Sequence, residues 1–139
     1  MSVVREQQLT SNTNTPTPDE IHAKFYPNRG LYSSADETVL KAQFAEMKRA
    51  GICGVILSWW GRPDEEGTHD TQGVNTDKIV EIVVKAAAEV EDIYVGFHLE
   101  PYSGRSAEKV VQDVRYLQDR FQDFSTTLLT DNRKRVVFY

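Results

Sequence analysis

The chain has 139 residues, of which 40% are hydrophobic and 27% charged, and its formal net charge is −5. These values indicate one packed domain and exclude a disordered chain. The negative charge argues against nucleic acid or an anionic membrane as the main partner, because both favour a basic surface. No apolar stretch approaches the roughly 18 residues that span a bilayer, and no signal-peptide core is found. The sequence as written therefore predicts a cytosolic chain without a membrane segment.

The first 20 residues are polar and rich in Ser, Thr, Asn and Pro. They show no hydrophobic periodicity, so we expect residues 1–20 to form a flexible lead-in. The composition changes at Ile21, and we expect residues 21–139 to form the folded unit. In this unit Ser34 and Glu37 match a capping box, which predicts a helix start. The helix should bury an apolar stripe and end at a glycine, given by Leu40, Phe44, Met47 and Gly51.

An unbroken apolar run, ICGVILSWW, follows over residues 52–60. Its length predicts a strand, and the lack of alternation predicts cover on both faces, as in a parallel sheet. The run contains Cys53, the single cysteine of the chain. One cysteine allows no internal disulfide and no cysteine-based zinc site. We interpret Cys53 as a small buried apolar side chain.

The same pattern then recurs twice along the chain. Asn75 or Thr76 is expected to cap a second helix, and the strand DIYVGFHLEPY follows it. Ser106 is expected to open a third helix, and the chain finishes in RVVFY, a third predicted strand. The predicted buried stripes of the two helices are Ile79, Val83, Ala86, Ala87 and Val90, and Val110, Val114, Leu117 and Phe121. Helices alternating with strands indicate an α/β fold with a parallel sheet.

Two architectures fit this alternation, an open doubly wound sheet and a (β/α)8 TIM barrel. The chain lacks the GxGxxG and GxxxxGK turns typical of nucleotide-binding doubly wound sheets. Its aromatic and polar residues gather after strands, where barrel enzymes place their active sites. We therefore favour the barrel. A complete barrel takes about 250 residues, so this chain is expected to form part of one.

His98 and Glu100 lie two apart on one predicted strand, so their side chains share a face. A carboxylate beside an imidazole can bind hydroxyls, tune a neighbouring acid or act as a base. The alternative is a buried His–Glu hydrogen bond that only orders the strand end. Trp59 and Trp60 should point to opposite sides, one beneath a helix and one toward the barrel mouth, where an aromatic face suits a sugar ring. The alternative is two core tryptophans.

The loop after the first predicted strand is acidic. A metal site is imaginable there, but GRPDEEGTHD lacks the spacing of a calcium loop, and a solvated loop is the preferred interpretation. The residues concerned are Asp64, Glu65, Glu66, His69 and Asp70. His22 carries no specific signal, and the basic run over residues 133–135 is too short to indicate nucleic-acid binding. The sequence predicts no metal and no cofactor.

Three segments, FYPNRGLYSSAD, AEMKRAGICGVILSWW and VGFHLEPYSGRSAEKVVQDVRYLQDRF, resemble glycoside hydrolase family 99. This family comprises the endo-α-1,2-mannosidases and related endomannanases, and the resemblance runs from about Ile21 to Tyr139. It implies a (β/α)8 barrel that cleaves inside α-mannose-containing glycans with retention, and for eukaryotic members N-glycan processing in the Golgi. The resemblance also implies an α-mannose-containing oligosaccharide as partner. The positions it assigns to substrate binding are Trp60, His98, Glu100 and Tyr102, and, in a loop, Tyr26 and Tyr32.

The sequence departs from the family in one respect that bears on activity. The family's two working glutamates lie in an Asn-Glu-Trp segment near the end of the barrel, and the 139 residues contain no such segment. Retaining hydrolysis needs two positioned carboxyl groups, so we expect no catalytic residue in this chain and an incomplete, inactive product. One alternative is a non-catalytic module that binds α-mannosides. The other is an incomplete gene model without a function of its own.

Overall fold

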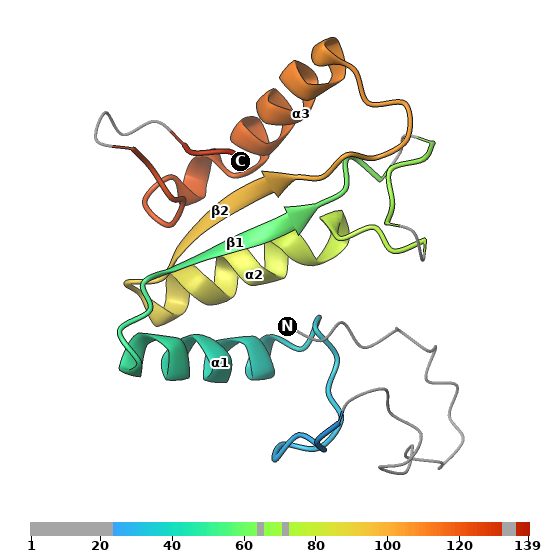
Figure 1. Cartoon of the computed structure of the whole chain (residues 1–139). Coiled ribbons are helices and arrows are strands. Elements are labelled where there is room, and N and C mark those ends of the chain that lie inside the picture. The colour runs from blue at the N-terminus through green and yellow to red at the C-terminus, as the bar shows by residue number, and fades with distance from the viewer. Residues whose placement is uncertain (1–23, 64–65, 71–72, 132–135) are drawn as a thin grey trace.

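A computed structural model describes residues 24–63, 66–70, 73–131 and 136–139 (Figure 1). Helices and strands alternate along the chain, and the two strands pair in parallel, which confirms the predicted α/β organisation. The expected lead-in over residues 1–20 lies outside the described residues. Two full strands are described, so closure into a barrel remains an expectation. In chain order the elements are α1 (Glu37–Arg49), β1 (Gly54–Trp59), α2 (Asp77–Val90), β2 (Tyr94–Leu99), α3 (Ala107–Arg120) and the 3-10 helix η2 (Gln122–Phe124).

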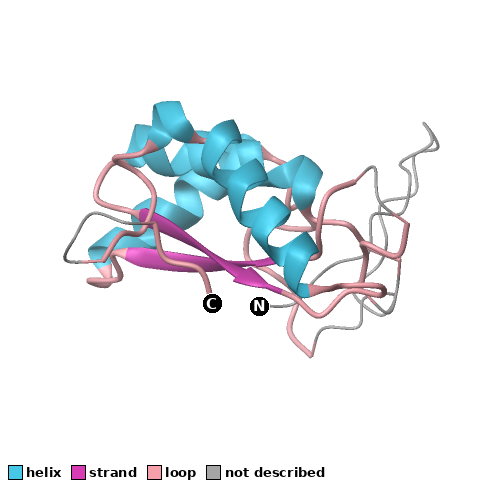
Figure 2. Ribbon diagram, turned by 90° about the horizontal axis from the view of Figure 1, so that it is seen from above, coloured by secondary structure: helices cyan, strands magenta, loops and turns pink. Residues whose placement is uncertain are grey.

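The long helices lie on one side of the sheet, and the other face is open (Figure 2). Alternate strand residues point under the helices, where Val95 and Phe97 are completely buried. The next residues along each strand point to the open face, and Ile56 there is 46% exposed. The prediction that the first strand is covered on both faces is therefore wrong for the described residues, because no second layer of helices lies against this face. The buried core also includes Leu40, Phe44, Val80, Val83, Val84, Ala86, Ala87, Leu117 and Phe121.

Helix α1 is capped two residues later than the predicted capping box implies. Asp36 is the cap, and its Oδ1 accepts hydrogen bonds from the backbone N–H groups of Thr38 and Val39 at 2.9 and 3.3 Å. The capping role predicted for Ser34 is wrong, since Asp36 directly precedes the first helical residue and has the stronger acceptor. The predicted helix end is confirmed: Gly51 follows the last turn with a φ of 76°, a conformation that favours glycine.

The caps of the other two helices agree with the sequence. The side chain of Asn75 accepts a hydrogen bond from the backbone N–H of Asp77 at 2.9 Å, which satisfies a free donor at the start of α2. The Thr76 hydroxyl instead donates to the backbone carbonyl of Ser58 at 2.8 Å and ties this helix to β1. Ser106 opens α3 as predicted, and its Oγ accepts from the Lys109 N–H. Ile79 and Val90, predicted on the buried stripe of α2, are only partly buried.

The last predicted strand has the expected neighbour but not the expected length. The Tyr139 N–H donates to the Phe97 carbonyl at 2.9 Å, and the Leu99 N–H donates to the Tyr139 carbonyl at 2.7 Å. Residues 136–139 therefore lie beside β2, but they form isolated bridges and no full strand. A second bridge, between Val95 and Leu128, was not predicted. Together these short pieces occupy the third position of the sheet.

Cys53 is exposed, which corrects its predicted burial. The residue lies just before the first residue of β1 and is not part of the strand. Its apolar neighbours along the chain suggested a core position, but they belong to an edge strand whose first residues face solvent. Local hydrophobicity therefore overestimated how much of this run is buried.

Candidate functional site

The predicted site residues of the two strands meet at the carboxyl ends of β1 and β2. Ser58 pairs with His98 and Trp59 with Leu99 across the parallel sheet. The Glu100 N–H donates to the Trp59 carbonyl at 2.9 Å, so the ladder continues past the last pair. Since side chains alternate between the faces of a sheet, Ser58 and His98 share the open face with the residues two positions further along each strand. Those residues are Trp60 and Glu100, which directly follow the last pair of the register.

Ser58, His98 and Glu100 form a hydrogen-bonded group, called here the carboxylate cluster. The Ser58 hydroxyl donates to Glu100 Oε1 at 2.6 Å, and His98 Nδ1 lies 3.0 Å from the same oxygen. This confirms that His98 and Glu100 share a face. Their side chains are 49% and 20% exposed, so the pair opens to solvent and is not the buried bond of the alternative interpretation. Ser58 and His98 both contact the carboxylate, which differs from the Ser–His contact that activates a serine nucleophile.

The surroundings of Glu100 stabilise its ionised form. The hydrogen bond from Ser58 lowers the pKa of the Glu100 carboxyl below its ordinary value, and partial burial opposes this. The hydrogen bond and charge of His98 and the charge of Arg105 lower the pKa further. At neutral pH the side chain is therefore a carboxylate, which accepts hydrogen bonds and has no proton to give. It is suited to binding hydroxyl groups and poorly suited to act as a general acid.

This lowered pKa predicts how Glu100 affects stability as the pH changes. A carboxyl group with a lowered pKa in the folded state stabilises the fold above its ordinary pKa, and this stabilisation is lost as the pH falls through the lowered value. The variant Glu100→Gln lacks the titration. We therefore expect the difference in free energy of unfolding between the two proteins to shrink on acidification. Urea unfolding across a pH series measures it, and a difference that stays constant would contradict the assigned contacts.

The two tryptophans at the end of β1 lie in different surroundings, as predicted. Trp59 is completely buried, and its Nε1 donates to Asp77 Oδ1 at 3.0 Å. Its ring also stacks on Tyr116 of α3, with ring centroids 6.2 Å apart. Trp60 is only partly buried. Trp59 is therefore the tryptophan beneath the helices, and the alternation of side chains predicts that Trp60 lies on the side of the carboxylate cluster.

Tyr102 is placed differently from the other predicted binding residues. It is 4% exposed, and its hydroxyl donates to Asp113 Oδ2 of α3 at 2.6 Å. Arg62, from the loop after β1, approaches the other oxygen of Asp113 at 3.5 Å. Asp113 therefore holds the two loops that follow β1 and β2. The described contact of the Tyr102 hydroxyl is an anchor within the protein.

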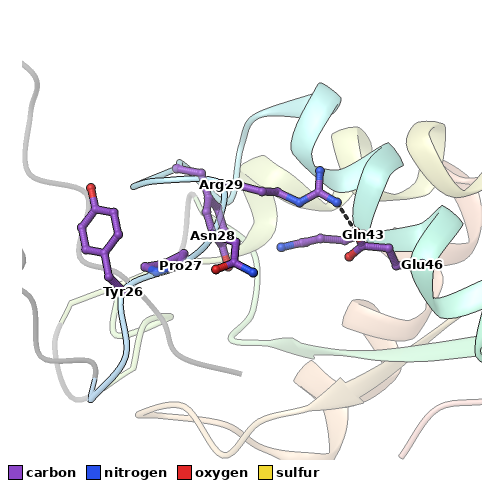
Figure 3. A pocket seen from close by; sticks show the side chains of 7 residues that line it. Tyr26, Pro27, Asn28, Arg29, Gln43 and Glu46 are labelled. Carbon is purple, nitrogen blue, oxygen red and sulfur yellow. Dashed lines mark hydrogen bonds and ion pairs between the residues drawn. The ribbon is translucent and has the colours of Figure 1, made fainter.

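Tyr26 and Tyr32 lie apart from the carboxylate cluster. Both line a cavity of about 410 Å³ between the loop that precedes α1 and α1 itself. Figure 3 shows Arg29 of the loop reaching the Glu46 carboxylate of α1 across this cavity, with the Tyr26 ring standing apart from the pair. In Figure 1 this loop lies beneath α1, away from the strand ends. The structure does not bring the two tyrosines together with Glu100.

The acidic loop has no described metal-ligand group. Asp64 and Glu65 lie outside the described residues, as do His22 and the basic run 133–135. Within the described ranges, no three His, Cys, Asp or Glu side chains are grouped as a metal site. His69 is exposed, with Nδ1 2.7 Å from the Asp70 backbone carbonyl. None of the helices in the described part of the chain is long and apolar enough to cross a membrane.

Sequence reasoning did not single out two residues that shape this region, Ser58 and Asp113. Ser58 lies two residues before Trp60, so the period of two already placed it on the same face. Asp113 follows Val110 by three residues and precedes Leu117 by four, which puts a carboxylate on a predicted buried stripe. A buried carboxylate requires partners. The need of a buried carboxylate for partners could therefore have indicated from the sequence that Asp113 binds other side chains.

Comparison with known proteins identifies the relatives of this chain. The family model described as Glycosyl hydrolase family 99 matches residues 4–139. Mouse glycoprotein endo-alpha-1,2-mannosidase is 36% identical over 104 residues, which are 75% of this chain and 21% of that protein. A human glycoprotein endo-alpha-1,2-mannosidase-like protein is 34% identical over 104 residues, again 75% of this chain and 22% of its own length. The chain thus spans about a fifth of these relatives.

A solved structure agrees with the sequence matches. The GH99 endo-alpha-mannosidase from Bacteroides thetaiotaomicron superposes with a TM-score of 0.70 and 25% sequence identity. The superposition covers 88% of this chain and 34% of the bacterial one. Sequence and fold therefore lead to the same group of glycoside hydrolases. The chain belongs to glycosyl hydrolase family 99.

Proposed function

We propose that this chain binds α-mannose-containing oligosaccharides at the ends of β1 and β2, as the substrate-holding part of an endo-α-mannosidase-type (β/α)8 barrel. The observation that carries the proposal is the carboxylate cluster on the open sheet face, with Glu100 ionised and bonded by Ser58 and His98. In a barrel, this face points inward and these strand ends form the mouth. The similarity to endo-alpha-1,2-mannosidases supports the same class of substrate.

The chemistry of the cluster suits a sugar. An ionised carboxylate accepts hydrogen bonds from hydroxyl groups, and such charge-assisted bonds are stronger than neutral ones. Trp60, which the alternation of side chains places on the same face as Glu100, offers an aromatic face for the C–H side of a pyranose ring. The combination of one stacking ring and one fixed acceptor orients a ring that has both an apolar and a polar side.

We further propose that the 139 residues bind this glycan without hydrolysing it. Retaining hydrolysis requires two carboxyl groups about 5–5.5 Å apart in different protonation states. Glu100, with its lowered pKa, does not supply the acid. Within the described ranges no second carboxylate bonds to the cluster. We include in the proposal that the chain binds N-glycans in the Golgi, the compartment that the family resemblance implies, and microscopy of the tagged chain in its own cells tests this location.

Calorimetry with α-1,2-mannobiose tests binding, and an α-1,2-mannoside reporter tests turnover. We expect saturable heat at millimolar sugar from the wild-type chain and none from Glu100→Gln, because the neutral amide loses the charge-assisted acceptor. The matched control is Glu91→Gln, since Glu91 is an exposed glutamate that precedes β2 at the other end of the strand. No heat from wild type, or equal heat from both variants, overturns the binding proposal. Robust reporter release overturns the proposal that binding occurs without hydrolysis.

A further inference from the structure

The two hydrogen bonds on Glu100 fall on the same oxygen. Ser58 Oγ is 2.6 Å and His98 Nδ1 is 3.0 Å from Oε1, and no bond from another described side chain is made to Oε2. A carboxylate held by two partners on one oxygen has a fixed plane. Its second oxygen then keeps its acceptor capacity for another group. In the cluster, Oε1 of Glu100 is therefore bound by Ser58 and His98, while Oε2 can accept a hydrogen bond from a ligand.

The backbone of Ser58 is held from two directions. Its carbonyl accepts the Thr76 hydroxyl at 2.8 Å, which fixes the strand from the helix side. Its pairing with His98 across the sheet fixes it laterally. His98 is about half exposed, and its Nδ1 lies at the longer distance of 3.0 Å from Glu100 Oε1. The shorter hydrogen bond to Glu100 is therefore the one from the serine hydroxyl.

We infer that Ser58 is a positioning residue for glycan binding: its hydroxyl orients the Glu100 carboxylate so that Oε1 is held within the protein and Oε2 receives a sugar hydroxyl. The inference rests on the proposed function for the identity of the ligand and goes beyond it in naming the residue that prepares the acceptor. Ser58 does not need to touch the sugar for this role. It acts through Glu100.

The test compares Ser58→Ala and Ser58→Thr in the whole chain, with Ser125→Ala as the matched control. Ser125 is exposed and follows η2 at the opposite end of the strands. The first readout is the pKa of the Glu100 carboxyl, from the ¹³C shift of labelled glutamate. We expect Ser58→Ala to raise this pKa, because the largest cause of its lowering is removed, and Ser58→Thr to restore it. Ser125→Ala should leave it unchanged.

The second readout is the affinity for α-1,2-mannobiose. We expect Ser58→Ala to weaken binding roughly fivefold to tenfold, which corresponds to the net contribution of about one hydrogen bond. Ser58→Thr keeps the hydroxyl and should recover the affinity. An unchanged Glu100 pKa in Ser58→Ala overturns the positioning role, whether or not the affinity for mannobiose changes. A raised pKa with unchanged affinity overturns the link to binding. If wild type binds no mannobiose, the proposed function fails, while the pKa arm still decides whether Ser58 holds Glu100.

Discussion

Replacing Asp77 by alanine should lower the free energy of unfolding by about 3 kcal/mol. Asp77 is 2% exposed at the first position of α2. Its carboxylate accepts hydrogen bonds from Trp59 Nε1 at 3.0 Å and the Tyr116 hydroxyl at 3.1 Å, and it pairs with Arg120 at 2.6 Å. Alanine would leave three donors without their acceptor. Because the Arg120 side chain is 24% exposed and can turn to water, we expect the lower end of the range for broken buried pairs.

Urea unfolding followed by tryptophan fluorescence measures this loss. The control is Asp92→Ala, which removes an aspartate that pairs with Lys48 but is 72% exposed. Exposed pairs contribute little, so its effect should stay within about 1 kcal/mol. Equal losses of unfolding free energy in Asp77→Ala and Asp92→Ala would contradict the view that the Asp77 carboxylate links β1, α2 and α3 through its hydrogen bonds.

The two adjacent tryptophans should separate stability from binding. Trp59→Ala empties a completely buried site and should cost about 3–5 kcal/mol of unfolding free energy. Trp60→Ala removes a ring that is only partly buried, so its cost should be much smaller, about 1 kcal/mol. The order of the two variants should reverse for binding. The affinity for mannobiose should fall at least about tenfold in Trp60→Ala, as expected for the loss of an aromatic contact.

Thermal melting and calorimetry on the same preparations decide this pair of expectations. A Trp60→Ala chain that melts as early as Trp59→Ala would place both rings in the core, the alternative that the sequence left open. A Trp60→Ala chain with normal melting and normal mannobiose binding would remove the ring from the proposed site. Binding by wild type is the positive control in both cases.

Features that depend on a few neighbouring residues were predicted well. Ser106 caps α3 and Gly51 ends α1, because a side-chain acceptor or a left-handed turn needs only the residues beside it. Asp36 shows the limit of this approach. It competes with Ser34 for the same role, and the choice depends on where the helix axis starts. The exposure of Cys53 and Ile56 was missed, since burial depends on which layers pack against a strand.

For a related reason, the sequence predicted one contact of the candidate site, between His98 and Glu100, but not the contact with Ser58. His98 and Glu100 lie on one strand, and the period of two places them together. Their contact with Ser58 depends on the register between strands 40 residues apart (98 − 58 = 40), which no local pattern specifies. Likewise, Arg120 of α3 donates a hydrogen bond to Asp77 of α2. These contacts form only after the elements dock.

The central place of β2 in the sheet has a consequence for recognition. On one side it pairs with β1, and on the other Val95 and Phe97 bridge Leu128 and Phe138. The backbone next to the His98 imidazole and the Glu100 carboxylate is therefore hydrogen-bonded along both edges of β2. For the proposed binding, little backbone freedom would be left to lose on association, so most of the entropic cost of ordering this backbone is met during folding.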